Sequence, residues 1–342
     1  MLRNLLQGAG FITVMSLALA GCQPAERIEV LSGPTMGSTY TIKYVATSTT
    51  PAADAAGVAV QGILDEIDRQ VSTYRADSDL SRFNQLPAGS CETMPEPVLE
   101  LVHYAHELAE MSDGQFDITI QPLLNAWGFG PNSRTHAVPS AEQIAEARNQ
   151  MGFRHLSVEG NQLCKEIELK LDLNSIAAGY TADRIAAKFE QLGIHSYMIE
   201  VTGELIAKGK KPDDSPWRIA LEQPLGNGER VVQHVLEVDG WSVNTSGDYR
   251  NYFEEDGVRF SHTLDPHSGA PIAHNLAAVT VIDRSAMAAD GLGTLLMVLG
   301  KEKGMEFARQ YEIAALFVTR EGEQFQSDSS PKFEELFPGK GR

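Results

Sequence analysis

Apolar residues recur every three to four positions in several stretches of the chain, and this spacing predicts amphipathic helices. The clearest stretches are residues 58–74 and 97–112, and Gly114 follows the second as a helix-ending residue. A Ser-x-x-Gln capping box at 140–143 predicts the start of another helix. Residues 179–192 show the same spacing before a glycine and predict one more helix.

Short β-branched runs between these segments predict strands. They cover residues 40–45, 197–201, 218–222, 231–238, 277–282 and 314–318. Residues 46–57 are polar and predict a loop before the first helix. Strands and helices do not alternate regularly, so the pattern favours an α+β fold over a doubly wound sheet. The sequence contains neither G-x-G-x-x-G nor a P-loop, which excludes the two common phosphate-binding loops.

The segment 287–300 is apolar except for one carboxylate, Asp290. Thr294 follows four residues later, so on a helix its hydroxyl would lie beside that carboxylate. A lone carboxylate in apolar surroundings is costly unless it is paired or binds a metal ion. The alternative is an Asp near a helix N-terminus that faces water or caps its own backbone. The segment alone leaves both interpretations open.

Composition places the chain among ordinary globular proteins. The chain is 42% hydrophobic and 22% charged, which is ordinary for a globular protein. Its 342 residues are enough for one large domain or two lobes with a sizeable core. The formal net charge of −18 argues against a nucleic-acid partner, because phosphate binding needs clustered Lys and Arg.

The N-terminus predicts export. Residues 9–20 form an apolar run too short to span a bilayer but suited to a signal peptide. The sequence LALAGC at 17–22 resembles the lipobox of bacterial lipoproteins, in which the cysteine carries the lipid anchor. We therefore predict a lipoprotein signal peptide at 1–21 and lipidation of Cys22, with an ordinary signal peptide and a chance cysteine as the alternative.

These assignments divide the chain into a lipidated tether at 22–30 and one folded domain at 31–338. Acyl chains would attach the protein to a bacterial membrane while the domain stays in the periplasmic water. The residue after the cysteine is Gln23 and not Asp. In enterobacterial lipoproteins the absence of Asp at this position favours the outer membrane over the inner one. An oxidising compartment permits a disulfide between Cys91 and Cys164, but two buried free thiols fit the sequence equally well.

Several segments carry possible chemistry, each with a structural alternative. HYAHE at 103–107 lacks the H-E-x-x-H spacing of a zinc site and indicates a helix surface. Residues 172–186 predict a turn from strand to helix, at which Gly179 allows close backbone approach and a helix N-terminus could face a phosphate. The alternative is an ordinary helix start with Asp183 in its first turns.

Two loops remain as candidates. Residues 114–131 combine aromatic residues with glycines and could line a pocket for a flat ring, or form part of the core. Residues 261–272 contain turn signals around His262, which is either a general base or a core histidine.

The order of these segments resembles the ApbE family, the FAD:protein FMN transferases. The matching segments, in order, are GPTMGSTYTI (33–42), VSTYRADSDLSRFN (71–84), DGQFDIT (113–119), WGFGP (127–131), GYTADRIA (179–186), NTSGDYRNYF (244–253), SHTLDPHSGAPI (261–272) and AADGLGTLLMVLG (288–300). They extend over nearly all of the predicted mature chain, and a lipoprotein signal is common in the family.

The resemblance implies two α+β subdomains with FAD and Mg²⁺ bound between them. It implies that FMN is transferred from FAD to a threonine hydroxyl of a partner protein and that AMP is released. The motif histidine, implied as the catalytic base, is His262. The implied Mg²⁺ ligands are the main-chain carbonyl of Ala177 and the side chains of Asp290 and Thr294. The implied FAD contacts are Met36, Tyr74, Gln115, Phe116, Asp117, Asn174, Tyr180 and Leu264.

The family suggests acceptor proteins such as subunits of Na⁺-pumping NADH:quinone oxidoreductase or Rnf-type complexes, or flavinylated periplasmic reductases. Three positions depart from the family pattern: Ala178 replaces a charged residue, Thr202-Gly203 replaces Gly-Gly, and Gly293 replaces a second carboxylate of some relatives. The same ligand set would also suit an FAD pyrophosphatase that hydrolyses FAD to FMN and AMP. A non-catalytic flavin-binding lipoprotein is a further alternative.

Overall fold

The main sheet has eight strands, and each neighbouring pair is antiparallel. In spatial order the strands are β1 (Arg27–Thr35), β2 (Ser38–Ala46), β6 (Tyr197–Val201), β7 (Glu204–Lys208), β10 (Trp241–Gly247), β15 (Leu276–Asp283), β16 (Ala314–Glu321) and β17 (Gln324–Ser329). This description comes from a computed structural model, which describes residues 26–131, 133, 137–225, 231–248, 251–322 and 324–341. The predicted signal peptide and Cys22 lie outside these residues.

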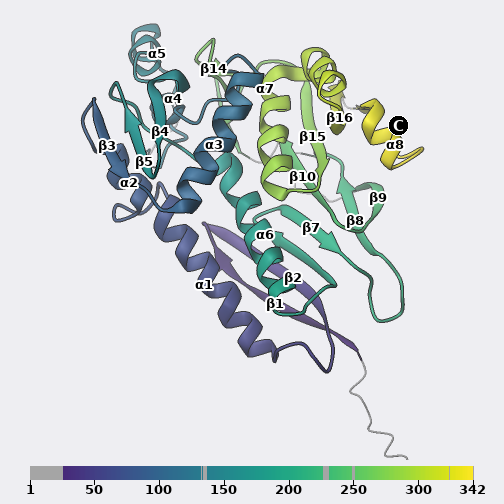
Figure 1. Cartoon of the computed structure of the whole chain (residues 1–342). Coiled ribbons are helices and arrows are strands. Elements are labelled where there is room, and N and C mark those ends of the chain that lie inside the picture. The colour runs from purple at the N-terminus through teal and green to yellow at the C-terminus, as the bar shows by residue number, and fades with distance from the viewer. Residues whose placement is uncertain are drawn as a thin grey trace, which may run out of the picture.

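Three helices cover one face of the sheet: α1 (Ala53–Val71), α6 (Asn174–Gln191) and α7 (Ala286–Gln310) (Figure 1). Alternate residues of β2, among them Tyr40, Ile42 and Tyr44, pack against α1 and α6. The opposite face packs against the hairpin of β8 (Trp217–Glu222) and β9 (Val232–Val238) and against α8 (Pro331–Leu336). The period of two along each strand therefore supplies apolar residues to two separate cores.

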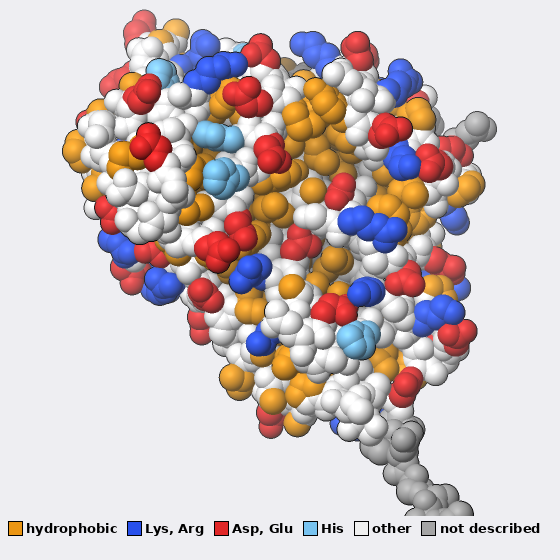
Figure 2. Space-filling view, in the orientation of Figure 1, with side chains coloured by type: hydrophobic (Ala, Val, Ile, Leu, Met, Phe, Trp, Pro, Cys, Tyr) orange, Lys and Arg blue, Asp and Glu red, His pale blue; other side chains and the backbone are white. Residues whose placement is uncertain are grey.

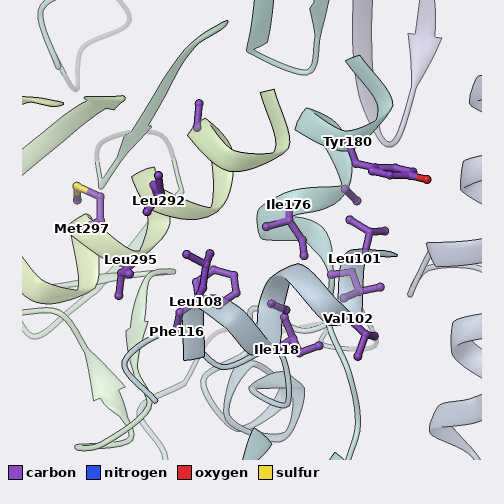
Figure 3. Close-up of a cluster of buried hydrophobic side chains, with 14 of the residues drawn as sticks. Leu101, Val102, Leu108, Phe116, Ile118, Ile176, Tyr180, Leu292, Leu295 and Met297 are labelled. Atoms are coloured by element: carbon purple, nitrogen blue, oxygen red, sulfur yellow. The ribbon is translucent and has the colours of Figure 1, made fainter. Parts of the chain in front are cut away.

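A smaller unit of helices and strands adjoins α6 and α7. Its sheet has the order β3 (Ser90–Thr93), β5 (Gln162–Lys165), β4 (Leu156–Glu159). Its helices are α2 (Asp79–Asn84), α3 (Glu96–Met111), α4 (Gln121–Ala126), α5 (Ala141–Arg148) and the 3-10 turn η1 (Phe153–His155). Short strands β11 (Tyr252–Glu255), β12 (Val258–Ser261), β13 (Leu264–Asp265) and β14 (Ala270–Pro271) form two hairpins. Figure 3 shows the shared core, where apolar side chains of α3, α6 and α7 point toward one another.

The α+β class predicted from the sequence is confirmed by this arrangement. The strand at 197–201 has the predicted ends, and Ser140 and Gln143 form the predicted capping box. Cys91 and Cys164 face each other across β3 and β5 and form a disulfide, which resolves the two alternatives left by the sequence. Among the described residues, no helix is both long enough and apolar enough to cross a membrane.

Two boundaries differ from the predictions. Strand β1 begins at Arg27, so regular structure starts inside the segment 22–30 that was predicted as a tether. Helix α6 begins at Asn174, so Gly179 lies inside the helix and not at its start. Gly179 has no room for a side chain, because an added Cβ would lie 2.3 Å from the carbonyl oxygen of Ala286. The close backbone approach predicted at this glycine is therefore an approach of α7 to α6.

Candidate active site

A cavity of about 960 Å³ lies where the main sheet, α7 and the smaller unit meet. Its walls come from the β1–β2 turn, the segment after α1, residues 115–124, the start of α6, the β6–β7 turn, the end of β10, residues 262–266 and the first half of α7. Of the predicted site residues in the described part of the chain, all line this cavity except Tyr180, and Cys22 lies outside that part. On the face shown in Figure 2, acidic and basic side chains are interspersed.

Asp290 is a buried residue of the cavity wall. Its side chain is 7% exposed, and its Oδ2 accepts a hydrogen bond from the backbone N–H of Gly179 at 3.1 Å. Burial raises the pKa of this carboxyl well above its ordinary value, and the neighbouring Glu204 carboxylate raises it further. Asp290 does not cap its own helix, because Ser285 caps α7 by accepting from the N–H of Ala288. The capping interpretation of the apolar segment is therefore wrong.

Asp290, Thr294 and Ala177 all line the cavity, and they carry three kinds of oxygen donor: a carboxylate, a hydroxyl and a main-chain carbonyl. Such hard oxygen ligands are those that Mg²⁺ prefers. In the described part of the chain, no three His, Cys, Asp or Glu side chains converge as a metal site. A cation held here would therefore depend on mixed donors and on oxygen atoms of a bound ligand.

His262 lines the same cavity and is oriented by the backbone of Asn251. Its Nδ1 lies 2.9 Å from the carbonyl oxygen of Asn251, which also accepts from the His262 backbone N–H. A carbonyl oxygen can only accept, so Nδ1 carries the proton and Nε2 of the neutral ring is free to take one. Burial lowers the pKa of His262, which keeps the ring neutral at lower pH. A neutral imidazole on the cavity wall can accept a proton at Nε2, which is what a general base must do.

Met36 and Tyr74 contribute apolar surface to the cavity. Met36 and Gly37 form the two-residue turn between β1 and β2, and both have positive φ, 47° and 73°. A methionine in this region is uncommon, and such strain is found preferentially at functional sites. Tyr74 also lines the cavity and is 71% exposed, so part of its side chain is accessible there.

The segment 115–117 forms another wall. Phe116 is buried, while the Gln115 amide donates to Nδ1 of His267 at 2.5 Å. Asp117 accepts from the backbone and hydroxyl of Thr119 and from the N–H of Phe153. Both Asp117 oxygens are thus engaged within the protein, and the residue contributes to the wall by fixing the loop.

Asp172 and Asn174 line the cavity at the start of α6. Asp172 accepts from the backbone N–H and the side-chain amide of Asn174, at 2.9 and 3.1 Å. Burial raises the pKa of Asp172 to about 6. Asn84 fixes the preceding segment, because its side chain binds both the N–H and the carbonyl of Leu171. Leu264 in β13 also lines the cavity and contributes an apolar side chain to its wall.

Tyr180 is the predicted contact that the structure places elsewhere. It is 4% exposed, is absent from the cavity walls, and its hydroxyl donates to Glu100. In Figure 3 its ring extends away from the Leu292 side of the core. On α6 the residues that face the cavity are Asn174, Ser175, Ala177 and Ala178, and Tyr180 points toward α3 instead.

Glu204 was missed by the sequence reasoning. It lines the cavity near Asp290, and its Oε2 accepts from the Thr202 hydroxyl at 2.7 Å. Thr202 and Gly203 form the two-residue turn between β6 and β7, in which Thr202 has a φ of 57°. The turn therefore exists despite a β-branched residue at its first position. The unusual Thr202-Gly203 pair is the sequence signal that could have directed attention to Glu204.

Comparison with known proteins agrees with these motifs. A family model described as the ApbE family matches residues 36–317. The FAD:protein FMN transferase of Vibrio cholerae is 44% identical over 319 residues, which cover 93% of this chain and 95% of that protein. The protein of the same name from Haemophilus influenzae is 40% identical over 342 residues, covering 96% and 97%.

Solved structures give the same result. The apo form of the Pseudomonas stutzeri flavinyl transferase ApbE superposes with a TM-score of 0.86 at 56% identity, covering 92% of this chain and 98% of that one. The Vibrio cholerae flavin transferase ApbE gives a TM-score of 0.85 at 40% identity, covering 91% and 99%. With most of its length matched by the family model and by these relatives, this chain belongs to the ApbE family.

Proposed function

We propose that this protein transfers FMN from FAD to a threonine hydroxyl of a partner protein in an Mg²⁺-dependent reaction that releases AMP. The observation that carries the proposal is the buried Asp290 carboxylate on the wall of a cavity that also contains Thr294 and His262. The cavity volume lies within the usual range for ligand sites, about 300–1,000 Å³. The relatives named FAD:protein FMN transferase support the same reaction.

The oxygen donors of Asp290, Thr294 and Ala177 fit Mg²⁺. Asp290 supplies a carboxylate, Thr294 a neutral hydroxyl and Ala177 a carbonyl, and few protein ligands leave room for phosphate oxygens and water. When bound, Mg²⁺ would neutralise charge that develops on the phosphate oxygens. A buried carboxylate with Glu204 and Asp183 as acidic neighbours also gains from a nearby cation, because like charges in a site of low polarity repel strongly.

The residues of the chain then have separate tasks. The acceptor threonine oxygen forms a bond to the FMN phosphorus, and the bond from that phosphorus to the AMP oxygen breaks. His262 takes the threonine proton at Nε2, since Nδ1 is already protonated and bound to the Asn251 carbonyl. Tyr74, Phe116 and Met36 supply apolar walls against which a flat ring can be held in position.

Substitution of Asp290 tests the proposal. Asp290→Asn keeps the volume and removes the charge, so we expect FMN transfer to fall by at least about a hundredfold while the fold persists. The protein is incubated with FAD, Mg²⁺ and an acceptor domain, and the acceptor's intact mass reports the FMN adduct. Glu302→Gln, which alters an exposed carboxylate of the same helix, serves as the control. Near-normal transfer by Asp290→Asn at low Mg²⁺ would refute the metal role.

The same assay separates transfer from hydrolysis. Transfer yields AMP and modified acceptor in equal amounts, whereas an FAD pyrophosphatase yields AMP and free FMN whether or not acceptor is present. We propose as acceptors subunits of Na⁺-pumping NADH:quinone oxidoreductase or Rnf-type complexes, or flavinylated periplasmic reductases. Replacing the acceptor threonine by valine should abolish the adduct, and an adduct that persists on that variant would contradict the choice of nucleophile.

We also propose that the protein is exported and anchored to a bacterial membrane, facing the periplasm, by lipid on Cys22. The LALAGC sequence after a short apolar run supports this. Cys22→Ser should release the protein from the membrane fraction without loss of transfer activity. A mature chain that begins elsewhere and carries no lipid would contradict the proposal.

A further inference from the structure

The first turn of α7 is held by a carboxylate from another helix. Asp183 of α6 accepts three hydrogen bonds there: from the Ser285 hydroxyl at 2.7 Å, from the Ala286 N–H at 2.8 Å and from the Met287 N–H at 3.0 Å. These N–H groups are donors that a helix start leaves without an intrahelical acceptor. A carboxylate at this position also complements the positive end of the helix dipole.

The contact between the two helices is reciprocal. While Asp183 of α6 binds the start of α7, Asp290 of α7 accepts from the N–H of Gly179 in α6. Gly179 and Asp183 are four residues apart and share one face of α6, as Ala286 and Asp290 share one face of α7. Because a Cβ at Gly179 would lie 2.3 Å from the Ala286 carbonyl oxygen, the helices meet at backbone contact distance here.

The helix does not need Asp183 in order to begin. Ser285 already caps α7, because its hydroxyl accepts from the N–H of Ala288 at 3.1 Å and its φ and ψ are extended. What Asp183 adds is the position of this first turn relative to α6. The Asn244 side chain, which donates to the Ala286 carbonyl at 3.0 Å, holds the same turn against the main sheet.

We propose that Asp183 is a positioning residue of the cation site, which fixes α7 against α6 so that Asp290 and Thr294 face Ala177 across the cavity end. The inference rests on the proposed function, because it takes these three residues as the cation donors. Asp183 itself is absent from the cavity walls, so it acts through α7 and not by contact with the ligand.

Geometry explains why one carboxylate has this effect. Asp290 is the fifth residue of α7, about 6 Å along the axis from the turn that Asp183 holds. A small rotation of the first turn therefore moves the Asp290 carboxylate and the Thr294 hydroxyl together, away from the Ala177 backbone. Metal sites lose about 10–100-fold in affinity when groups that orient the ligands are removed.

The test compares Asp183→Asn and Asp183→Ala with the unaltered protein. Asn keeps one acceptor oxygen and Ala keeps none, so we expect the Kd for Mn²⁺ to rise in the order Asp, Asn, Ala, by about tenfold or more for Ala. Binding of Mn²⁺ is followed by electron paramagnetic resonance with FAD present and no acceptor protein, after subtraction of an FAD-only blank.

Ser330→Ala is the matched control, because Ser330 caps α8 far from the cavity and also binds the N–H of Ala315. It should lower the Tm and leave the Kd for Mn²⁺ unchanged. If both Asp183 variants lower the Tm but bind Mn²⁺ as tightly as the unaltered protein, the positioning role is overturned. If Asp290→Asn also binds Mn²⁺ with the original Kd, the cation site of the proposed function fails instead, so the two failures are distinguishable.

Discussion

Asp172 provides a prediction that depends on the fold alone. Its carboxyl is buried at the start of α6, and burial raises its pKa from 3.8 to about 6. In the unfolded chain the group ionises near 3.9, so between pH 4 and 6 the folded state holds more protons than the unfolded state. Stability contributed by the protonated form is therefore complete below pH 4 and is lost as the pH rises through 6.

The size of the effect follows from the two pKa values. A difference of 2.2 between 3.8 and about 6 corresponds to about 3 kcal/mol at 1.36 kcal/mol per pKa unit. Asp172→Asn removes this cost, since the amide keeps an acceptor for the Asn174 N–H. Roughly 1.4 kcal/mol of this gain in the variant's stability should develop between pH 5 and pH 8. The reason is that the folded-state pKa of about 6 lies about one pH unit above pH 5.

The assay is urea unfolding of both proteins at pH 5 and pH 8, without FAD and with the disulfide intact. We expect the variant's free energy of unfolding, relative to the unaltered protein, to increase by about 1.4 kcal/mol from pH 5 to pH 8. Glu159→Gln, at an exposed carboxyl, should change stability by no more than about 0.5 kcal/mol at either pH. A difference that is the same at pH 5 and pH 8 for Asp172→Asn would refute the burial argument.

Three further predictions concern other parts of the molecule. His262→Gln should lower the rate of FMN transfer by about 10²–10⁴-fold and remove the acidic limb of the pH–rate profile. In the unaltered protein the midpoint of that limb should lie below pH 6.5, because burial lowers the pKa of His262. An acidic limb that is unchanged in the variant would contradict the role of His262 as the base. Gly179→Ala should destabilise the protein by about 1–3 kcal/mol in thermal unfolding, because the new Cβ meets the Ala286 carbonyl, while Gly62→Ala in open space on α1 should be neutral or stabilising. Cys91→Ser should cost about 2–5 kcal/mol in urea unfolding by removing the disulfide, and equal stability of the two proteins would count against that estimate.

The sequence predicted the elements whose local pattern agrees with their tertiary environment. Strand β6 alternates regularly and is buried, so its ends were predicted correctly. Strand β1 was missed, because Gly33 and Pro34 indicate a turn and an edge strand tolerates them. Strand β10 was missed because its Asn-Thr-Ser-Gly run resembles a loop, although pairing with β7 and β15 keeps it extended.

The site was predictable mainly through the order of its motifs. That order indicated which distant segments would meet, and the cavity brings nearly all of them together. Side-chain direction was less predictable: Tyr180 lies in a matching motif but points toward Glu100 on α3. Asp183 was considered only for its own helix, whereas it binds the start of α7. Contacts between helices far apart in sequence leave no periodic signal, so local patterns do not show them.

The cavity walls are drawn from segments spread between Met36 and Val298, and these segments belong to more than one hydrophobic core. A ligand that contacts all of them adds its binding free energy only when every wall is in place. A bound ligand therefore makes the unfolding of the separate cores more cooperative. Partial opening of any one core would remove part of the binding site, and the binding free energy of the ligand would be lost. Bound FAD should therefore slow limited proteolysis at the β1–β2 turn. It should slow cleavage near the start of α7 to a similar extent.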